Sequence, residues 1–257
     1  MKKKIIVLLL IIAGFFLLNI PAKQAYVLPI LMYHKIDKEE SLKTKLAVSP
    51  EAFEKQMAFL KRCKYNTVSL KEAVELIKAK KKIPHNTVVI TFDDGYENNY
   101  TKAYPVLKKY NIPATIFVIV DFIGRPGYFT AEQVKELSGS GLVTIGSHTL
   151  EHKVLTQIDD LYLDKEIFYS KKILEVFTKK PVELLCYPLG AFNEKVRQKV
   201  IDAGYIAAVA TNPGKDYPKD DIYALKRIRI SENSANMFIF WAEISGYYTF
   251  IKEHRDD

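Results

Sequence analysis

Short apolar runs alternate with amphipathic segments along most of the chain, and this alternation predicts the fold. The apolar runs, which are typical of strands buried on both faces, include VLPILMY, TVVITF, ATIFVIV, LVTIGS, VELLCY and YIAAVA. Between them lie segments with apolar residues at helical spacing. One unbroken series of alternating strands and helices predicts parallel βαβ units, and it favours an α/β barrel of about seven parallel strands over an open sheet.

Several polar residues mark where the helices begin. Ser49, Ser69 and Thr130 stand at N-cap positions, just before segments with helical periodicity. We expect one long helix over residues 158–177. Pro105 predicts a local irregularity in the helix that follows the motif TFDDGY, because proline lacks the backbone N–H of a regular helix.

The first residues indicate a targeting segment. Lys2–Lys4 are followed by an uncharged and almost wholly apolar run over 5–20. This pattern is that of a secretory signal peptide, or of an uncleaved N-terminal membrane anchor, and both alternatives stay open for residues 1–25. Both a signal peptide and a membrane anchor would place residues 26–257 outside the cytoplasmic membrane. No linker interrupts residues 26–257, so we expect one domain there.

Net charge limits the classes of binding partner that we expect, and the cysteine positions bear on disulfide formation. The net charge is +8, but four of these charges lie within the first 25 residues, which leaves a mild excess over the folded part. Such an excess is compatible with an anionic cell envelope, and it is too small to indicate nucleic-acid binding. Cys63 and Cys186 are far apart in sequence, and we expect both to be buried free thiols.

Three motifs stand where predicted strands end, which is where parallel α/β folds gather functional groups: TFDDGY, SHTLEH and CYPLGAFN. His148 and His152 in the second motif are four residues apart. This spacing equals one helical turn and brings two rings to one helix face. Two histidines with a carboxylate form a good set of ligands for a divalent metal, although an isolated pair is more often a surface feature.

Asp93 and Asp94 are adjacent, so their charges repel and one pKa would rise unless a cation lies between them. A metal resolves this conflict if one aspartate is a ligand, because the other is then free to act as a base for water. The alternative is structural: an Asp-Gly sequence often starts a turn or caps a helix.

In this order, TFDDGY, SHTLEH and YPLGAFN resemble the motifs of the polysaccharide deacetylases, that is, carbohydrate esterase family four with its NodB-homology domain. The resemblance extends over about residues 30–230. It implies a distorted (β/α) barrel and metal-dependent N-deacetylation of N-acetylglucosamine polymers. It also implies one divalent ion, zinc, with cobalt or nickel as substitutes. The resemblance implies that Asp93 is the catalytic base and that the backbone N–H of Leu189 stabilises the oxyanion. The three implied metal ligands are Asp94, His148 and His152.

The chain departs from the family pattern at three places, one of which is the fourth motif, an Asp-containing stretch ending in Trp, which has no clear match. The third motif usually begins with an arginine that orients the base, and here Cys186 stands at that position. The late motif that carries the acid histidine has no match, since the only histidine after His152 is His254 in the terminal sequence KEHRDD.

One subgroup, the poly-β-1,6-N-acetylglucosamine N-deacetylases of the intercellular-adhesin type, takes its acid from the N-terminal strand. PILMYHKI is similar to that segment, which makes His34 the candidate acid, with a buried structural histidine as the alternative. LKRIRI is also similar to this subgroup. Arg227 is therefore a candidate for the missing cation, and Arg229 fits almost as well. Tyr187, together with Phe192 and Trp241, is a candidate for stacking on sugar rings or for the core.

These observations predict a secreted or membrane-anchored N-deacetylase that acts as a monomer on an N-acetylglucosamine polysaccharide, with poly-N-acetylglucosamine as the expected substrate. The alternatives are a peptidoglycan or chitooligosaccharide N-deacetylase and a carbohydrate O-acetyl esterase. A non-catalytic carbohydrate-binding protein has only the missing arginine in its favour.

Overall fold

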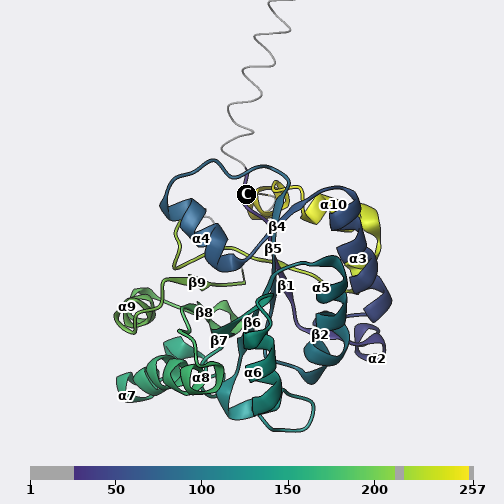
Figure 1. Ribbon diagram of the computed structural model, residues 1–257. Helices are drawn as coiled ribbons and strands as arrows, with labels where there is room; N and C mark the ends of the chain where they lie inside the picture. The colour runs from purple at the N-terminus through teal and green to yellow at the C-terminus, as the bar shows by residue number, and fades with distance from the viewer. Residues whose placement is uncertain (1–25, 212–216, 255–257) are drawn as a thin grey trace, which may run out of the picture.

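A parallel sheet forms the centre of the molecule (Figure 1). The computed structural model describes residues 26–211 and 217–254. The strand order is β10-β1-β5-β6-β7-β8-β9, and β4 also pairs with β5. A separate two-stranded sheet joins β2 and β3. The strands are β1 (Ile30–Tyr33), β2 (Lys35–Ile36), β3 (Ala47–Val48), β4 (Asn66–Val68), β5 (Thr87–Phe92), β6 (Ala114–Val118), β7 (Val143–Ser147), β8 (Leu184–Cys186), β9 (Ala207–Val209) and β10 (Ile228–Arg229).

The sheet curves into a distorted barrel, and the segment that leads into β10 connects its two ends. Ala210 N–H donates to Leu225 O at 3.0 Å on the β9 side, and Arg227 N–H donates to Thr211 O at 3.1 Å. The same segment then continues as β10, which pairs with β1. The barrel expected from the strand–helix alternation is confirmed.

Helices cover the outside of this barrel (Figure 1). The N-caps expected from the sequence are present: Ser49 accepts from Ala52 N–H, Ser69 accepts from Glu72 N–H, and Thr130 forms a capping box. Within the described ranges, none of the helices is long and apolar enough to cross a membrane. They are α2 (Lys38–Ser41), α3 (Pro50–Arg62), α4 (Leu70–Lys78), α5 (Tyr104–Tyr110), α6 (Ala131–Gly139), α7 (Asp160–Asp164), α8 (Ser170–Thr178), α9 (Glu194–Asp202), α10 (Met237–Glu243) and α11 (Tyr248–His254).

Two helices differ from the regular form that their sequences suggest. A π-helical turn over Asn99–Ala103 precedes α5, next to the irregularity expected at Pro105. A second π-helical turn, Lys165–Tyr169, separates α7 from α8 and interrupts the long helix expected over 158–177. Apolar periodicity cannot distinguish an α-helix from one that contains such a turn, because the added residue shifts the pattern only slightly.

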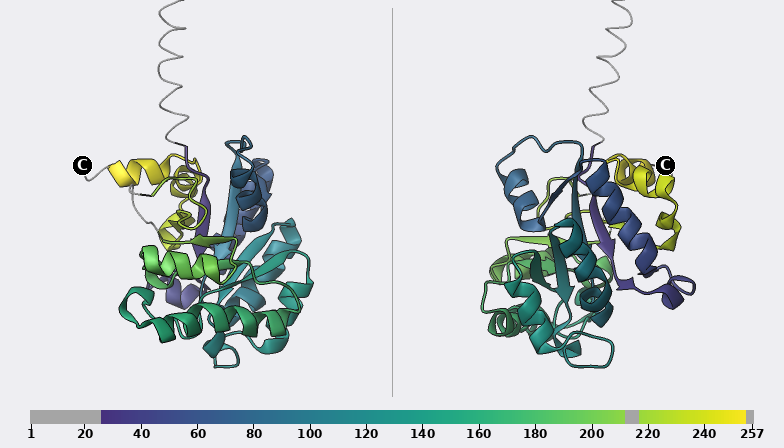
Figure 2. Two further views of the ribbon diagram at one scale, coloured as in Figure 1. Left: turned by 90° about the vertical axis from the view of Figure 1, so that its left-hand side faces the viewer. Right: turned by 45° about the vertical axis from the view of Figure 1, so that its right-hand side comes forward.

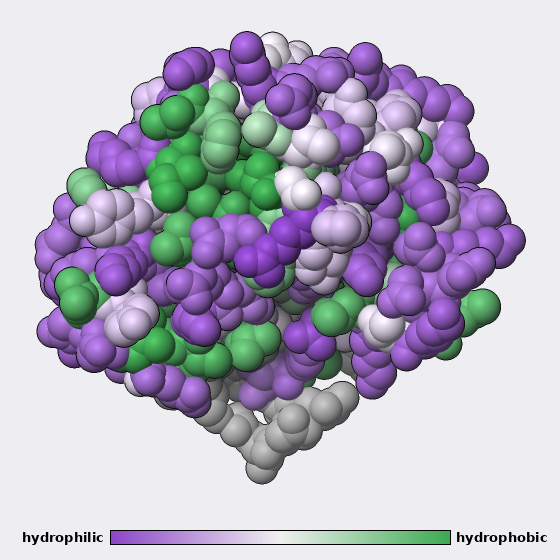
Figure 3. All heavy atoms as spheres, turned by 90° about the horizontal axis from the view of Figure 1, so that it is seen from below, coloured by the Kyte–Doolittle hydropathy of each residue, from purple (hydrophilic) through white to green (hydrophobic). Residues whose placement is uncertain are grey.

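The core fills both faces of the sheet. All six residues of β5 are buried, as expected for a strand between helices and barrel interior. Inside the barrel Phe117 occupies the space beside Gly146, where a Cβ atom would lie only 2.5 Å from the ring. The surface seen from below is mostly hydrophilic, with one broad hydrophobic area (Figure 3). Both thiols are free as expected, but Cys63 is exposed, so the expectation of two buried thiols is wrong for this residue.

The chain enters the described structure at one end of the barrel. Val27 N–H donates to Gly246 O at 2.7 Å, in the connection between α10 and α11. The segment that leads into β1 and the C-terminal helices therefore lie side by side, as both views of Figure 2 show. The targeting segment expected over residues 1–25 lies outside the described residues.

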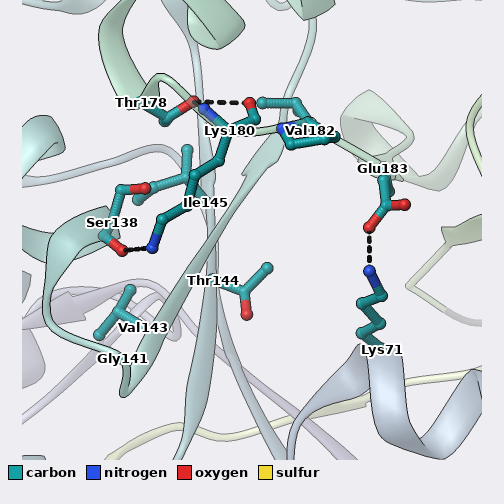
Figure 4. A pocket seen from close by; sticks show the side chains of 11 residues that line it. Lys71, Ser138, Gly141, Val143, Thr144, Ile145, Thr178, Lys180, Val182 and Glu183 are labelled. Carbon is teal, nitrogen blue, oxygen red and sulfur yellow. Dashed lines mark hydrogen bonds and ion pairs between the residues drawn. The ribbon is translucent and has the colours of Figure 1, made fainter.

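A surface pocket opens beside the first residues of β7 and the segment that leads into β8 (Figure 4). Lys71 and Glu183 form an ion pair on one side, and Lys180 Nζ donates to Ser138 O on the other. In its lining, Val143 is the first residue of β7 and Glu183 directly precedes β8, so the pocket lies at the N-terminal ends of these strands. The three sequence motifs follow the opposite ends, so this pocket is separate from the candidate site.

Candidate active site

The ends of neighbouring strands bring the sequence motifs together. Asp93 and Asp94 follow directly after β5, His148 follows β7, and Cys186 ends β8. These strands are parallel and lie in one sheet, with β6 between β5 and β7. Their carboxyl ends therefore share one edge of the barrel, as the motif positions predict.

Three side chains at this edge form a candidate metal centre. Donor atoms of Asp94, His148 and His152 all lie within 4.8 Å of one another. Asp94 Oδ1 is 3.4 Å from His148 Nε2 and 3.8 Å from His152 Nε2. The structure thus brings together the three residues that the sequence analysis names as ligands.

The chemistry of this donor set fits a divalent ion of the zinc type. His148 Nδ1 lies 2.9 Å from the carbonyl oxygen of Cys186, which directs Nε2 toward Asp94. Burial lowers the pKa of both His148 and His152, so their nitrogens are neutral and able to act as ligands at neutral pH. Two imidazole nitrogens and one carboxylate oxygen leave coordination positions open for water and substrate.

The histidine pair does not lie on a helix, so the helical-turn argument for its spacing is wrong. Thr149 and His152 have left-handed backbone conformations, with φ of 66° and 63°, and the segment between them forms an irregular turn. The turn nevertheless brings the two rings together, with centroids 4.6 Å apart. His152 N–H donates to Thr149 Oγ1 at 3.2 Å, which stabilises the turn.

Asp93 is held on the other side by a buried arginine. Arg227 Nη1 and Nη2 each donate to one carboxylate oxygen of Asp93 at 2.7 Å. The guanidinium also donates to Ala210 O, to Thr91 Oγ1 and to Cys186 Sγ, at 3.1, 3.2 and 3.0 Å. Arg227 therefore lies against the residue that stands where the family motif has its arginine, and it supplies a bidentate cation to Asp93.

These contacts decide the protonation state of the two aspartates. Burial alone would raise the pKa of Asp93, but the charge and hydrogen bonds of Arg227 hold it well below its usual range. Burial also raises the pKa of Asp94. His148 acts to lower it, but burial is the larger effect, so the pKa of Asp94 lies above its usual value. Asp93 is thus a stable carboxylate, whereas Asp94 lacks such a partner and would gain most from a cation.

A second group of donors lies deeper, and it shares His148 with the first. Asp93, His148 and Cys186 also place ligand atoms within 4.8 Å of one another. Arg227 Nη2 is 3.0 Å from Cys186 Sγ, so a full positive charge already occupies the edge of this group. That charge repels a metal ion, and the Asp94 group is the better candidate centre.

His34 lies at the end of β1, beside the base. His34 Nε2 is 3.9 Å from Asp93 Oδ2, so the structure brings the candidate acid and the candidate base to one place. Burial lowers the pKa of His34, although the carboxylate of Asp93 acts in the opposite direction. Its other ring nitrogen, Nδ1, is buried and has no hydrogen-bond partner among the described residues.

The third motif presents Leu189 just after β8. This residue has a left-handed backbone with φ of 55°, and its side chain is 72% exposed. Tyr187 is in the core instead, where its hydroxyl donates to Tyr223 O, so it cannot stack on a sugar. Phe192 stacks on Tyr187 and is partly buried, while Trp241 is exposed on α10.

Two buried polar residues that the sequence analysis did not name hold the loops of the site, and each comes from a π-helical turn. Glu166 Oε2 accepts the backbone N–H groups of Leu150 and Glu151 at 3.0 Å each, in the turn that carries His152. Asn99 Nδ2 donates to the carbonyl oxygen of His34 at 2.7 Å. The sequence offered no signal for either residue, because a π-helical turn is visible only in the backbone.

Comparison with known sequences gives the same assignment as the motifs. The sequence model of the family described as polysaccharide deacetylase matches residues 80–208. Bacillus subtilis YxkH, whose name places it among the polysaccharide deacetylases, is 39% identical over 211 residues, which are 82% of this chain and 72% of that protein. A poly-β-1,6-N-acetyl-D-glucosamine N-deacetylase of Staphylococcus aureus is 30% identical over 201 residues, 73% of this chain and 69% of that one.

Solved structures resemble the whole barrel. The Streptococcus pyogenes deacetylase PplD, determined with acetate, has a TM-score of 0.74 at 30% identity and covers 80% of this chain and 93% of its own. IcaB of Ammonifex degensii has a TM-score of 0.72 at 25% identity and covers 86% and 98%.

Proposed function

Because this chain belongs to the polysaccharide deacetylase family, whose members are hydrolases of amide bonds, we propose that it is a metal-dependent N-deacetylase of N-acetylglucosamine units in an extracellular or cell-wall polysaccharide. The substrate that we propose is poly-N-acetylglucosamine. The Staphylococcus aureus relative named for that activity, at 30% identity, supports this choice.

The observation that carries the proposal is the convergence of Asp94, His148 and His152 beside an aspartate that is held ionised. Donor atoms of the three lie within 4.8 Å of one another, and Asp93 is fixed next to them by Arg227. A metal held by the three would activate a water molecule, and a free carboxylate beside it would serve as the general base, which together are sufficient means to hydrolyse an unactivated amide. This arrangement argues against a purely carbohydrate-binding protein.

In this proposal a divalent ion, zinc in the first place and cobalt or nickel as substitutes, would be held by Asp94, His148 and His152. When bound, it would supply Lewis-acid chemistry, which makes a water molecule a better nucleophile and the acetyl carbonyl a better electrophile. The remaining roles belong to the side chains around it.

Asp93 accepts the proton of the attacking water on its carboxylate. Arg227 keeps this carboxylate ionised and fixes the direction of both oxygens through its two hydrogen bonds of 2.7 Å. An ionised and oriented base is ready for the water, although its lowered pKa makes it a weaker proton acceptor than a carboxylate in water. Precise positioning compensates for that weakness.

The leaving amine needs a proton, and in this proposal His34 gives it. Its Nε2 is 3.9 Å from Asp93, so acid and base flank the same point. The backbone N–H of Leu189 would donate to the oxygen that becomes negative during attack. The left-handed backbone at Leu189, with φ of 55°, turns the chain sharply at this place.

We also propose that the domain lies outside the cytoplasmic membrane, secreted or attached by its N-terminal segment, and that it acts as a monomer. The apolar run over 5–20 after Lys2–Lys4 supports the location. A polysaccharide of the cell surface would be accessible from there.

Amine release tests the proposal. Zinc-loaded protein is incubated with poly-N-acetylglucosamine, with peptidoglycan and with an acetylated xylan, each with and without a chelator. The expected result is chelator-sensitive amine release from poly-N-acetylglucosamine. Amine release from peptidoglycan alone would change the substrate, and acetate release from xylan without amine would favour the esterase. No reaction with any of the three would refute the catalytic function.

A further inference from the structure

The turn that carries His152 is held by side chains. The backbone N–H groups of residues 149–152 all donate to side-chain oxygens. Glu166 Oε2 accepts two of these bonds, from Leu150 and Glu151, at 3.0 Å each. One carboxylate oxygen therefore satisfies two of the four donors of the turn. The other two donate to hydroxyl oxygens, Thr149 N–H to Ser147 Oγ at 3.1 Å and His152 N–H to Thr149 Oγ1 at 3.2 Å.

The backbone of this turn is strained, so its conformation depends on such bonds. Thr149 and His152 have left-handed backbones, with φ of 66° and 63°, and a β-branched residue such as threonine rarely adopts that conformation. A residue in a sparsely populated conformation keeps it only where the surrounding structure determines it. If the bonds were lost, the turn would relax, and His152 Nε2 would no longer be fixed 3.8 Å from Asp94 Oδ1.

Glu166 is an unusual residue in its surroundings. It is 1% exposed, and no cationic side chain of the described residues forms an ion pair with it. Burial of a carboxylate without a cationic partner is unfavourable, and glutamate is almost never fully buried in this way. The two N–H groups of the turn stabilise this carboxylate, so the turn and Glu166 depend on each other.

A second connection joins the same helical segment to the turn. Ser147 Oγ, which accepts Thr149 N–H, donates to Ser170 Oγ at 2.9 Å. Ser170 Oγ in turn donates to the carbonyl oxygen of Glu166 at 2.7 Å. Glu166 belongs to the π-helical turn Lys165–Tyr169, and such turns are frequent at functional sites. Both connections therefore lead from this irregular part of the helix to the backbone before His152.

We propose that Glu166 is a positioning residue for the candidate metal centre. By holding the turn over 149–152, it keeps His152 beside Asp94 and His148 and so raises the affinity of the centre for zinc. The inference rests on the proposed role of His152 as a ligand. Glu166 acts through its hydrogen bonds to the backbone and does not bind the ion itself. The turn requires an acceptor oxygen at this place and does not require the negative charge.

Zinc affinity of the metal-free full chain, measured by calorimetry with zinc alone, tests this role. Glu166→Ala removes the acceptor, whereas Glu166→Gln keeps an oxygen for the two N–H groups without the charge. His152→Ala, alone and combined with Glu166→Ala, shows whether Glu166 acts through this ligand. Glu232→Ala is the control, because Glu232 also accepts two hydrogen bonds, from the N–H and the hydroxyl of Ser49, in a segment without a candidate ligand.

We expect Glu166→Ala to weaken zinc binding by about 10-fold or more, and Glu166→Gln to remain within about 3-fold of the native chain. Glu232→Ala should change the affinity by less than about 2-fold. In the His152→Ala background, Glu166→Ala should weaken binding further by less than about 2-fold, because the ligand that Glu166 positions is already absent. Thermal unfolding without zinc identifies a variant that does not fold. Glu166→Met, which fills the space without an acceptor, then replaces Glu166→Ala.

Three results would each overturn the inference. They are native zinc affinity in Glu166→Ala, equal losses in Glu166→Gln and Glu166→Ala, and the same loss from Glu166→Ala with and without His152. Unchanged zinc affinity in His152→Ala would overturn both the ligand role of His152 and this inference. Zinc affinity is measured without substrate. A native chain that binds zinc with the expected dependence on Glu166, but releases no amine from any polysaccharide, refutes the proposed function alone.

Discussion

Replacing Arg227 by methionine should destabilise the protein in a pH-dependent way. The side chain is 4% exposed and donates two hydrogen bonds of 2.7 Å to Asp93, which is 3% exposed. Methionine fills similar space without the charge. Breaking a buried ion pair from one side costs about 3–5 kcal/mol, because the remaining charge has no partner.

The sign of the pH dependence follows from Asp93. In the native protein its pKa is held below the ordinary value, so the pair contributes stability that is present above about pH 4 and is lost as the pH falls below that value. Without Arg227 burial dominates and the pKa of Asp93 rises above its unfolded value. The variant therefore loses stability as the pH increases from about 4 toward neutrality.

Urea unfolding of metal-free protein at pH 5 and at pH 8 measures both effects. We expect the deficit of Arg227→Met to approach 3–5 kcal/mol at pH 8 and to be smaller at pH 5. Arg227→Lys, which keeps the charge but not the bidentate geometry, should recover part of it. A deficit below about 1 kcal/mol, or one that is equal at the two pH values, would show that Arg227 does not stabilise the buried carboxylate of Asp93.

Further predictions concern the core and the metal ligands. Gly146→Ala should lower the free energy of unfolding by about 1–3 kcal/mol, because the new Cβ would lie 2.5 Å from the ring of Phe117. Gly139→Ala is the control, because a Cβ at that position has no atom within 4 Å, and it should not destabilise the protein. Thermal unfolding of the two variants measures the difference. Burial raises the pKa of Glu243 to about 7, so the native protein should lose stability as the pH rises from about 4.5 to about 7. Glu243→Gln should therefore be more stable than the native protein at pH 8, by up to about 3 kcal/mol. Equal stabilities at pH 8 would contradict the raised pKa of Glu243. His152→Ala should weaken zinc binding by at least about 10-fold in calorimetry, and an unchanged affinity would exclude it as a ligand.

The fold was predictable because the strands are buried on both faces, so that their sequences are apolar throughout. TVVITF and ATIFVIV became β5 and β6 close to the expected bounds. The small additions were not predictable: β2, β3 and α2 are too short to leave a periodic pattern.

The site was predictable where residues follow strands directly. Asp94 and His148 needed only the parallel order of the strands. His152 was named through a helical spacing that the structure does not have, since the turn depends on left-handed residues. Arg227 and Arg229 could not be separated by alternation, because residues two apart in a strand are expected on the same face. Their depth decides: Arg227 is buried, while Arg229 is exposed.

We propose that the two adjacent aspartates have different roles, one as metal ligand and one as base, and zinc affinity together with amide turnover in Asp93→Asn and Asp94→Asn measures the two roles separately. If Asp94 is the ligand and Asp93 the base, Asp94→Asn loses zinc affinity. Asp93→Asn keeps it and loses turnover by about 10²-fold or more. If Asp93→Asn loses zinc while Asp94→Asn retains it, the ion is bound by the deeper group of Asp93, His148 and Cys186, and the roles proposed for the two aspartates are wrong.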